Sequence, residues 1–185
     1  MFLKYTWCGQ LLSALITHLE LSFLFFVLWI FSISLFETTP GGIILTVIFV
    51  LIFAFTLYNA SYQAEKNDAK SYTKLEPKWY KGALLPTFIL GMNVICIVSY
   101  LLVWKFACAD GGLTSLWAVA VNAVSLFWFA PYQKLVPLEA GTIGTIGYVC
   151  MFTVPILSCF LGYYAGYKNF DLTEKLHKFT YEKKK

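Results

Sequence analysis

Arginine is absent from this chain of 185 residues, and all fourteen of its basic residues are lysines. Arginine is the side chain that most often holds phosphate or carboxylate groups through two parallel hydrogen bonds. Its absence argues against an enzyme that acts on nucleotides or phospholipid headgroups. Charged residues of both signs are also scarce, at 13% of the chain, compared with about 25% in a typical soluble domain.

The sequence also lacks the short motifs that carry much of enzyme chemistry. It contains no H-E-x-x-H zinc motif, no G-x-S-x-G nucleophile turn and no glycine-rich phosphate loop. The five cysteines form no C-x-x-C pair, and no cysteine or histidine spacing is typical of a metal site. We therefore expect a protein with no catalytic residues, no metal site and no cofactor. Its lysines lie beside apolar segments, which does not favour nucleic acid as a partner.

Apolar residues are abundant, at 59% of the chain, and they gather in long segments. Four of these segments are near or above the roughly 17–25 residues that a helix needs to cross a bilayer. They are residues 11–36, 42–58, 82–104 and 142–164. The pattern predicts an all-α integral membrane protein with four transmembrane helices packed as an antiparallel bundle. Residues 1–185 would form a single membrane domain.

A fifth apolar segment, residues 113–130, decides the predicted topology. If it does not cross the membrane, twelve lysines lie on one side and two on the other, whereas a crossing divides them seven and seven. The positive-inside rule favours the first arrangement. We expect a short outer helix there, either re-entrant or lying in the interface, with five spans as the alternative. Both termini would be cytoplasmic in a plasma membrane, which compactness and the lack of organelle signals suggest is bacterial.

Lysines recur every four residues after the second apolar segment. The spacing predicts that this helix continues beyond the membrane until Pro77, within a basic cytoplasmic connection of residues 63–81. Residues 168–185 form a second basic segment, which we interpret as an amphipathic cytoplasmic tail. Docking of anionic membrane lipid or of an acidic partner is predicted for Lys66, Lys70, Lys74, Lys78, Lys175 and Lys178.

Small residues recur at helical spacing in the fourth apolar segment. They are Gly141, Gly144 and Gly147, followed by Gly162 and Gly166 in a G-x-x-x-G pattern. Such faces let helices approach closely in lipid. We expect these glycines to pack helices within the bundle, with homodimerisation as the alternative.

A row of polar residues runs along the first part of the chain, at alternating spacings of four and three: Thr6, Gln10, Ser13, Thr17 and Glu20. Such a row occupies one face of a helix. This stretch either lies in the inner interface and then turns into the first span, or belongs to one long helix whose polar face packs against its neighbours. In both arrangements we expect Glu20 near the cytoplasmic edge, with His18 and Glu20 extending toward water.

The remaining candidates gather at the predicted outer end. Asn93 and Asn122 are polar groups inside apolar segments, and such groups are the default functional candidates in a membrane protein. For Asn93, a hydrogen bond that bridges two helices is the favoured alternative to ligand binding. A tentative ligand site consists of Asn93, Trp104, Lys105, Asp110, Trp117, Asn122 and Trp128. The competing interpretation is an aromatic belt with a few solvated charges.

These observations together predict a non-enzymatic accessory or interaction protein of the membrane, such as a subunit of a transport or envelope complex. The alternative is a small transporter or ligand-binding subunit with an outer-side pocket. The expected partners are membrane lipid, another protein or a second copy of the chain.

Overall fold

The described part of the chain is built from helices alone. The computed structural model describes residues 6–34, 39–70, 76–107, 116–132, 134–135 and 145–168. In chain order its elements are α1 (Trp7–Phe31), α3 (Thr39–Asp68), α4 (Lys81–Leu84), α5 (Thr87–Ala107), α6 (Leu116–Trp128), the 3-10 helix η2 (Ala130–Tyr132) and α7 (Thr145–Tyr167). No strand occurs among these residues, which confirms the predicted all-α fold.

Four helical segments are long and apolar enough to cross a membrane. They contain 23 to 29 residues, with mean hydropathy between 1.8 and 2.5: Trp7–Phe31, Pro40–Asp68, Lys81–Val103 and Thr145–Tyr167. Helix α6 has 13 residues. Its length of about 20 Å is short for a hydrocarbon layer of about 30 Å. The prediction of four long apolar helices and one shorter one is confirmed, and the described length of α6 does not favour five spans.

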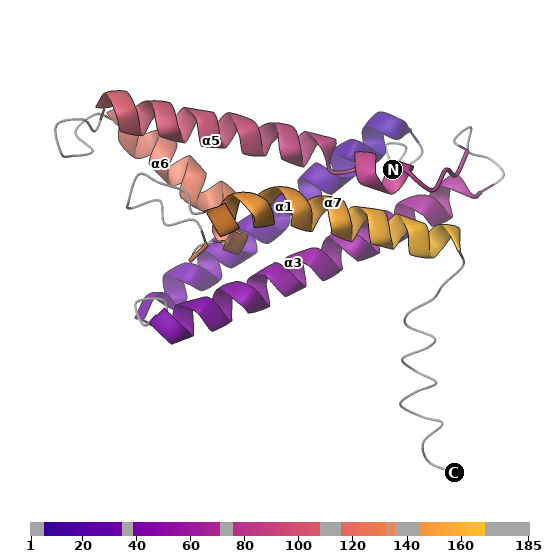
Figure 1. The fold of residues 1–185 in the computed structure, drawn as a ribbon, viewed down its shortest axis with the longest axis horizontal. Coiled ribbons are helices and arrows are strands. Elements are labelled where there is room, and N and C mark those ends of the chain that lie inside the picture. The colour runs from indigo at the N-terminus through magenta and orange to yellow at the C-terminus, as the bar shows by residue number, and fades with distance from the viewer. Residues whose placement is uncertain are drawn as a thin grey trace, which may run out of the picture.

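The four long helices alternate in direction, so that the first turn of α1 and the last turn of α7 lie at the same end of the bundle (Figure 1). We call this the terminal end. At the opposite end, α1 finishes and α3 begins. Helices α4 and α5 together make the third long segment. Pro86 separates them, because proline has no backbone N–H to continue the helical ladder.

Helix α1 is continuous through its polar row. The hydroxyl of Thr6 accepts a hydrogen bond from the backbone N–H of Gly9 at 3.2 Å and so caps the first turn. Of the two arrangements that the sequence allowed, the structure has the single long helix. Glu20 therefore lies near the middle of this 25-residue helix.

Helix α3 ends at Asp68, well before Pro77. Asn67 and Asp68 have side chains that favour helix ends over helix interiors, and backbone hydrogen bonds from the next two residues close the last turn. Lys70 and Lys78 therefore do not continue one stripe along α3. The predicted helical extension was wrong because the side chain of Asp68 is held by groups from other helices, as described below.

Helices α3 and α7 approach closely at glycine. A Cβ atom added to Gly162 would collide with the backbone of Tyr58, and one added to Gly166 would lie 2.8 Å from Oε2 of Glu65. Both glycines of the G-x-x-x-G pattern thus lie on the face of α7 that packs against α3. Gly147 is buried, whereas Gly141 and Gly144 lie outside the described residues.

Helix α6 runs from the end of α5 into the interior of the bundle (Figure 1). At its last residue, the indole of Trp128 lies 4.2 Å from the ring of His18, measured between centroids. Residues 128–132 are all buried. The chain then turns back, because the backbone N–H of Lys134 reaches Thr46 Oγ1, in the first turns of α3, at 3.4 Å. We call α6 and η2 together the re-entrant segment, after the arrangement expected from the sequence.

Polar side chains from α5 and α1 hold the tip of the re-entrant segment. The side chain of Asn93, 1% exposed, accepts a hydrogen bond from Trp128 Nε1 at 2.7 Å and donates one to the carbonyl of Met151 at 2.9 Å. The Met151 carbonyl is available because the residue four positions later is Pro155, which has no N–H to donate. Ser22 donates to the Trp128 carbonyl at 3.3 Å. The backbone groups left free by a proline and by a helix end are thereby paired.

Candidate functional site

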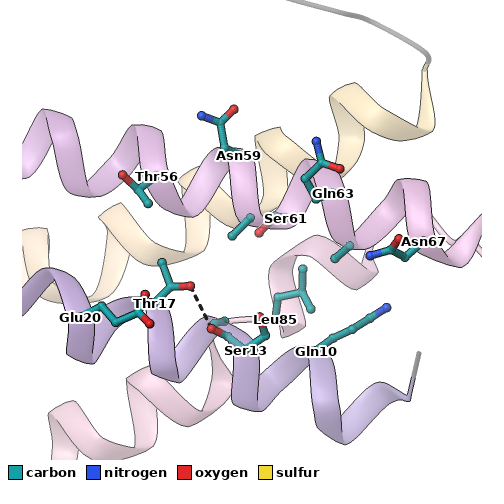
Figure 2. Close-up of a pocket in the computed structure, with 13 residues that line it drawn as sticks. Gln10, Ser13, Thr17, Glu20, Thr56, Asn59, Ser61, Gln63, Asn67 and Leu85 are labelled. Carbon is teal, nitrogen blue, oxygen red and sulfur yellow. Dashed lines mark hydrogen bonds between the residues drawn. The ribbon is translucent and has the colours of Figure 1, made fainter. Parts of the chain in front are cut away.

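Two polar stripes lie on neighbouring helices and line the same pocket. On α1 the stripe contains Gln10, Ser13, Thr17 and Glu20, and on α3 it contains Thr56, Asn59, Gln63 and Asn67. In each stripe successive residues are three or four positions apart, which places them on one face of the helix. Figure 2 shows the two stripes on either side of a pocket. We call this pocket the α1–α3 groove.

The α1–α3 groove has a volume of about 350 Å³. Its remaining lining consists mostly of small side chains, namely Ala14, Ala60, Ser61 and Ala64, together with Leu85 from the start of the third span. Glu20, Asn59 and Gln63 are exposed at its rim. From Gln10 to Glu20 the groove extends for about 15 Å at 1.5 Å per helical residue. It reaches from the terminal end to the middle of the bundle.

The groove exists because α1 and α3 diverge. Toward the opposite end the two helices are in direct contact, with the rings of Phe25 and Phe49 stacked at 4.6 Å and those of His18 and Phe53 at 5.3 Å between centroids. Toward the terminal end the ribbons separate (Figure 1). Large aromatic residues occupy the contact region, and the groove begins where polar and small residues replace them.

Asp68 closes the terminal end of the groove. Its carboxylate accepts hydrogen bonds from Gln10 Nε2 at 2.5 Å and from the Tyr163 hydroxyl at 2.7 Å. It also forms an ion pair with Lys81 at 3.2 Å, and its own side chain is fully buried. Trp7 lies under the same ammonium, 5.8 Å from ring centroid to Nζ. One carboxylate therefore joins α1, α3, α4 and α7. It links α1 to α3 at the end of the bundle where their backbones diverge.

Glu20 is the one ionisable side chain among the residues that line the groove. It is exposed on the rim near the middle of α1. None of the described lysines forms an ion pair with it. Ile16, one turn earlier on α1, is 44% exposed, so the rim beside Glu20 is apolar. A carboxylate at this depth is costly in lipid unless a cation or water accompanies it.

A second polar group in the groove also lacks a partner. Gln10 is 4% exposed, and its side-chain oxygen makes no hydrogen bond with the described residues, although its nitrogen is bonded to Asp68. Thr17 donates to the carbonyl of Ser13 at 3.0 Å, which leaves its hydroxyl oxygen able to accept (Figure 2). Hydrogen-bonding capacity therefore remains unused along the groove.

The predicted outer ligand site is not assembled by the described residues. Asn93 and Trp128 bond to each other in the core, and their hydrogen bonds hold the re-entrant tip. Asn122 has a buried side-chain oxygen without a hydrogen-bond partner among the described residues. The side chains of Trp104, Lys105 and Trp117, and the whole of Asp110, lie outside the described part of the chain. The described residues also contain no group of three His, Cys, Asp or Glu side chains that could hold a metal ion.

His18 differs from its expected position. It was expected to extend toward water, but it is 1% exposed and packs between Phe53 and Trp128. The residue lies on the core face of α1, two positions before Glu20, and consecutive positions of that spacing point to different sides of a helix. The two residues therefore have separate roles.

Three of the predicted docking lysines belong to the described part of the chain, and each contacts a different polar group. Lys66 donates to the carbonyl of Gly166 at 3.4 Å, near the C-terminal end of α7. The helix dipole stabilises a cation at this end of a helix. Lys70 donates to the side chain of Asn67 at 2.8 Å, and Lys78 pairs with Glu76 at 3.9 Å. Lys74, Lys175 and Lys178 lie outside the described residues.

Sequence reasoning found one half of the groove and missed the other. The polar row on α1 was recognised in the sequence, but on α3 only the four-residue spacing of the lysines from Lys66 onward was recognised. A matching signal was present, since Thr56, Asn59, Gln63 and Asn67 follow spacings of three and four within a span. Gly82 is also a packing residue, since a Cβ added there would lie 2.6 Å from the Cβ of Tyr163. It was not identified from the sequence.

Comparison of this chain with models of protein families, with curated proteins and with solved structures finds no match.

Proposed function

We propose that this chain is a non-enzymatic subunit of a membrane complex, and that it binds a transmembrane helix of a partner protein along the α1–α3 groove. The observation that carries the proposal is the pair of polar stripes that line one pocket, within two helices long and apolar enough to span a membrane. Polar side chains in the hydrocarbon layer need internal partners, because lipid supplies none. A partner helix with polar residues would satisfy them.

The shape of the groove supports a helix as its occupant. A span of about 15 Å corresponds to roughly three helical turns at a pitch of 5.4 Å. The small residues along the lining would allow a close approach of backbones, as at other helix contacts in membranes. Exposed apolar residues such as Ile16 and Ile52 flank the polar stripes. They would pack against the apolar faces of the same helix.

The chemistry of the lining supports binding over catalysis. General acid–base or nucleophilic catalysis generally requires two or more cooperating polar groups of matched reactivity. The lining offers amides, hydroxyls and a single carboxylate, that of Glu20. These groups form hydrogen bonds and one ion pair well, but they contain no acid–base pair.

We further propose that the terminal end faces the cytoplasm of a bacterial plasma membrane. The described lysines at this end are Lys66, Lys70, Lys78, Lys81 and Lys168, whereas Lys134 belongs to the opposite end. This asymmetry agrees with the positive-inside rule. The groove then opens within the cytoplasmic half of the bilayer. The outer-side pocket expected from the sequence is replaced in this proposal by an inner one.

A second candidate function is binding or transport of a small polar molecule. The volume of about 350 Å³ favours it, because it lies at the lower end of the range for ligand sites, roughly 300–1,000 Å³. The two functions differ in what occupies the groove in native membranes. A partner helix gives a protein adduct of fixed mass on photocrosslinking, whereas a small molecule does not.

Photocrosslinking in native membranes tests the proposal. A small diazirine amino acid is placed at Thr17 in the groove or, as a control, at Val98, a 48%-exposed residue of α5 outside the groove. We expect position 17 to give one discrete protein adduct, identified by mass spectrometry as a membrane-spanning protein, and position 98 to give only lipid. Lipid adducts alone at both positions would show the proposal to be wrong.

A further inference from the structure

We infer that the partner helix carries a lysine or arginine near its middle, and that this basic side chain pairs with Glu20. The inference rests on the proposed function, since it names the chemistry of the helix that the groove receives. The basic side chain of the partner would determine which helices bind in the groove.

Charge supports this occupant. Glu20 gives the lining of the groove a formal charge of −1, and no other lining residue is ionisable. A carboxylate near the middle of a span is favoured when a cation accompanies it, because each charge alone is costly in hydrocarbon. The same argument applies to a basic residue in the middle of a partner's span. Pairing removes both costs together, so that the two charges select one another.

The position of Glu20 supports a partner within the membrane. The residue is exposed on the rim, beside the exposed apolar residue Ile16, and not on the packed face of α1. It lies about 15 Å along the helix from Gln10, where Asp68 and Lys81 form the closed end. A cation that reaches Glu20 from the side therefore comes from within the bilayer.

A second copy of this chain does not meet the requirement. Within the four long apolar segments, lysine occurs only at Lys66 and Lys81, both at segment ends. Arginine is absent throughout. No long helix of this chain has a lysine or arginine near its middle, and His18 of α1 is 1% exposed in the core. A homodimer would therefore leave Glu20 without a cation. The basic residue must come from a different protein.

The remaining groups of the groove suit the same helix. The unpartnered side-chain oxygen of Gln10 accepts hydrogen bonds. Asn59 and Gln63, exposed on the opposite rim, both donate and accept. A partner helix with a basic residue, and with a polar residue one turn away, would pair with Glu20 and hydrogen-bond to one of these amides at the same time. This combination distinguishes the partner from an ordinary apolar span.

Model peptides test the inference in the purified full chain in bilayer nanodiscs. One peptide is a leucine–alanine transmembrane helix with a single central lysine, and the other has methionine at that position. With the diazirine at Thr17, we expect the lysine peptide to crosslink roughly tenfold more than the methionine peptide. Glu20→Gln, which keeps the shape and hydrogen bonding of the side chain, should reduce the two yields to the same level. Glu76→Gln, which removes an exposed carboxylate outside the groove, should leave the preference unchanged.

Equal yields of the two peptides with the wild-type chain would overturn the inference, as would a lysine preference that survives in Glu20→Gln. Identification of the native partner gives a separate check, because its adducted span must contain a lysine or arginine. A native adduct whose span lacks a basic residue would contradict the ion pair and leave the docking function standing. If native membranes give no protein adduct at position 17, both the docking function and this inference fail.

Discussion

The side-chain amide of Asn93 donates a hydrogen bond to the backbone carbonyl of Met151 at 2.9 Å, across the contact between α5 and α7. In an uninterrupted helix this carbonyl would accept from the residue four positions later, but that residue is Pro155. The side-chain oxygen of Asn93 accepts from Trp128 at the re-entrant tip. One asparagine therefore joins α7, at the carbonyl that Pro155 leaves without an N–H, to the tip of the re-entrant segment.

Asn93→Ala should destabilise the protein, because it leaves the Trp128 indole and the Met151 carbonyl unpaired in the core. At about 1–3 kcal/mol for each of these two unpaired buried groups, we expect a loss of about 2–6 kcal/mol in the free energy of unfolding. Unfolding in mixed micelles, followed by tryptophan fluorescence, measures this loss.

The link to Pro155 has its own control. Pro155→Ala supplies a backbone N–H to the Met151 carbonyl. In a chain that carries Pro155→Ala, the further substitution Asn93→Ala therefore leaves only the Trp128 indole unpaired. The loss caused by Asn93→Ala should then be smaller by about 1 kcal/mol. Equal losses in the two backgrounds would show that Asn93 does not compensate for the proline.

Gly162→Ala should weaken the contact between α3 and α7. The added methyl group would meet the backbone of Tyr58, which cannot move aside as a flexible side chain can. Overpacking of this kind costs about 1–3 kcal/mol. Gly91→Ala is the matched control, because nothing lies within 4 Å of the Cβ that it would add. Thermal unfolding in detergent should separate the two variants, and similar transition temperatures would argue against the close approach.

Asp68→Asn should loosen the terminal end of the bundle. The substitution leaves Lys81 without its carboxylate, and breaking a buried pair costs about 3 kcal/mol or more. The pair Lys78–Glu76 provides the comparison, since its side chains are 49% and 84% exposed. Glu76→Gln should therefore change stability by less than about 1 kcal/mol. Chemical denaturation of both variants measures the difference, and a loss for Asp68→Asn as small as that for Glu76→Gln would contradict the role given to Asp68.

Hydropathy alone was sufficient to predict the four long helices and the short one. Burial in lipid requires about twenty apolar residues per helix, and this local property is visible in sequence. The helix limits were less predictable, since α1 begins at Trp7 and includes polar residues that hydropathy assigns to the interface. Those residues are tolerated because they face α3.

The groove depends on contacts between distant positions, which spacing in one segment does not reveal. The row on α1 was recognised, but its partner row on α3 became significant only when the antiparallel contact placed Gln10 beside Asp68. Likewise, Asn93 was named as a candidate ligand group, while its hydrogen-bond partners are supplied by Trp128 and Met151 from two other elements. A side chain's partners are set by tertiary packing, and sequence alone could not choose between ligand binding and helix bridging.

The orientation of the bundle can be measured by cysteine labelling. Lys134→Cys and Lys70→Cys, in a background with the native cysteines replaced by alanine, report on the two ends. With a membrane-impermeant maleimide on intact cells, we expect labelling of position 134 alone, with position 70 labelled only after permeabilisation. This is the result expected if the chain enters and leaves α6 on the same side of the membrane. Labelling of both positions from one side would contradict the re-entrant path.

The most direct test of the central claim is the labelling rate of a cysteine in the α1–α3 groove with and without the native membrane around it. Thr17→Cys, in the same alanine background, is treated with a water-soluble maleimide in inside-out native vesicles and as purified chain in nanodiscs. If a partner helix occupies the groove, the rate should be lower by roughly tenfold in the native vesicles. The lipid-facing Val98→Cys should remain slow in both. Equal rates for Thr17→Cys in the two preparations would mean that the groove has no resident partner.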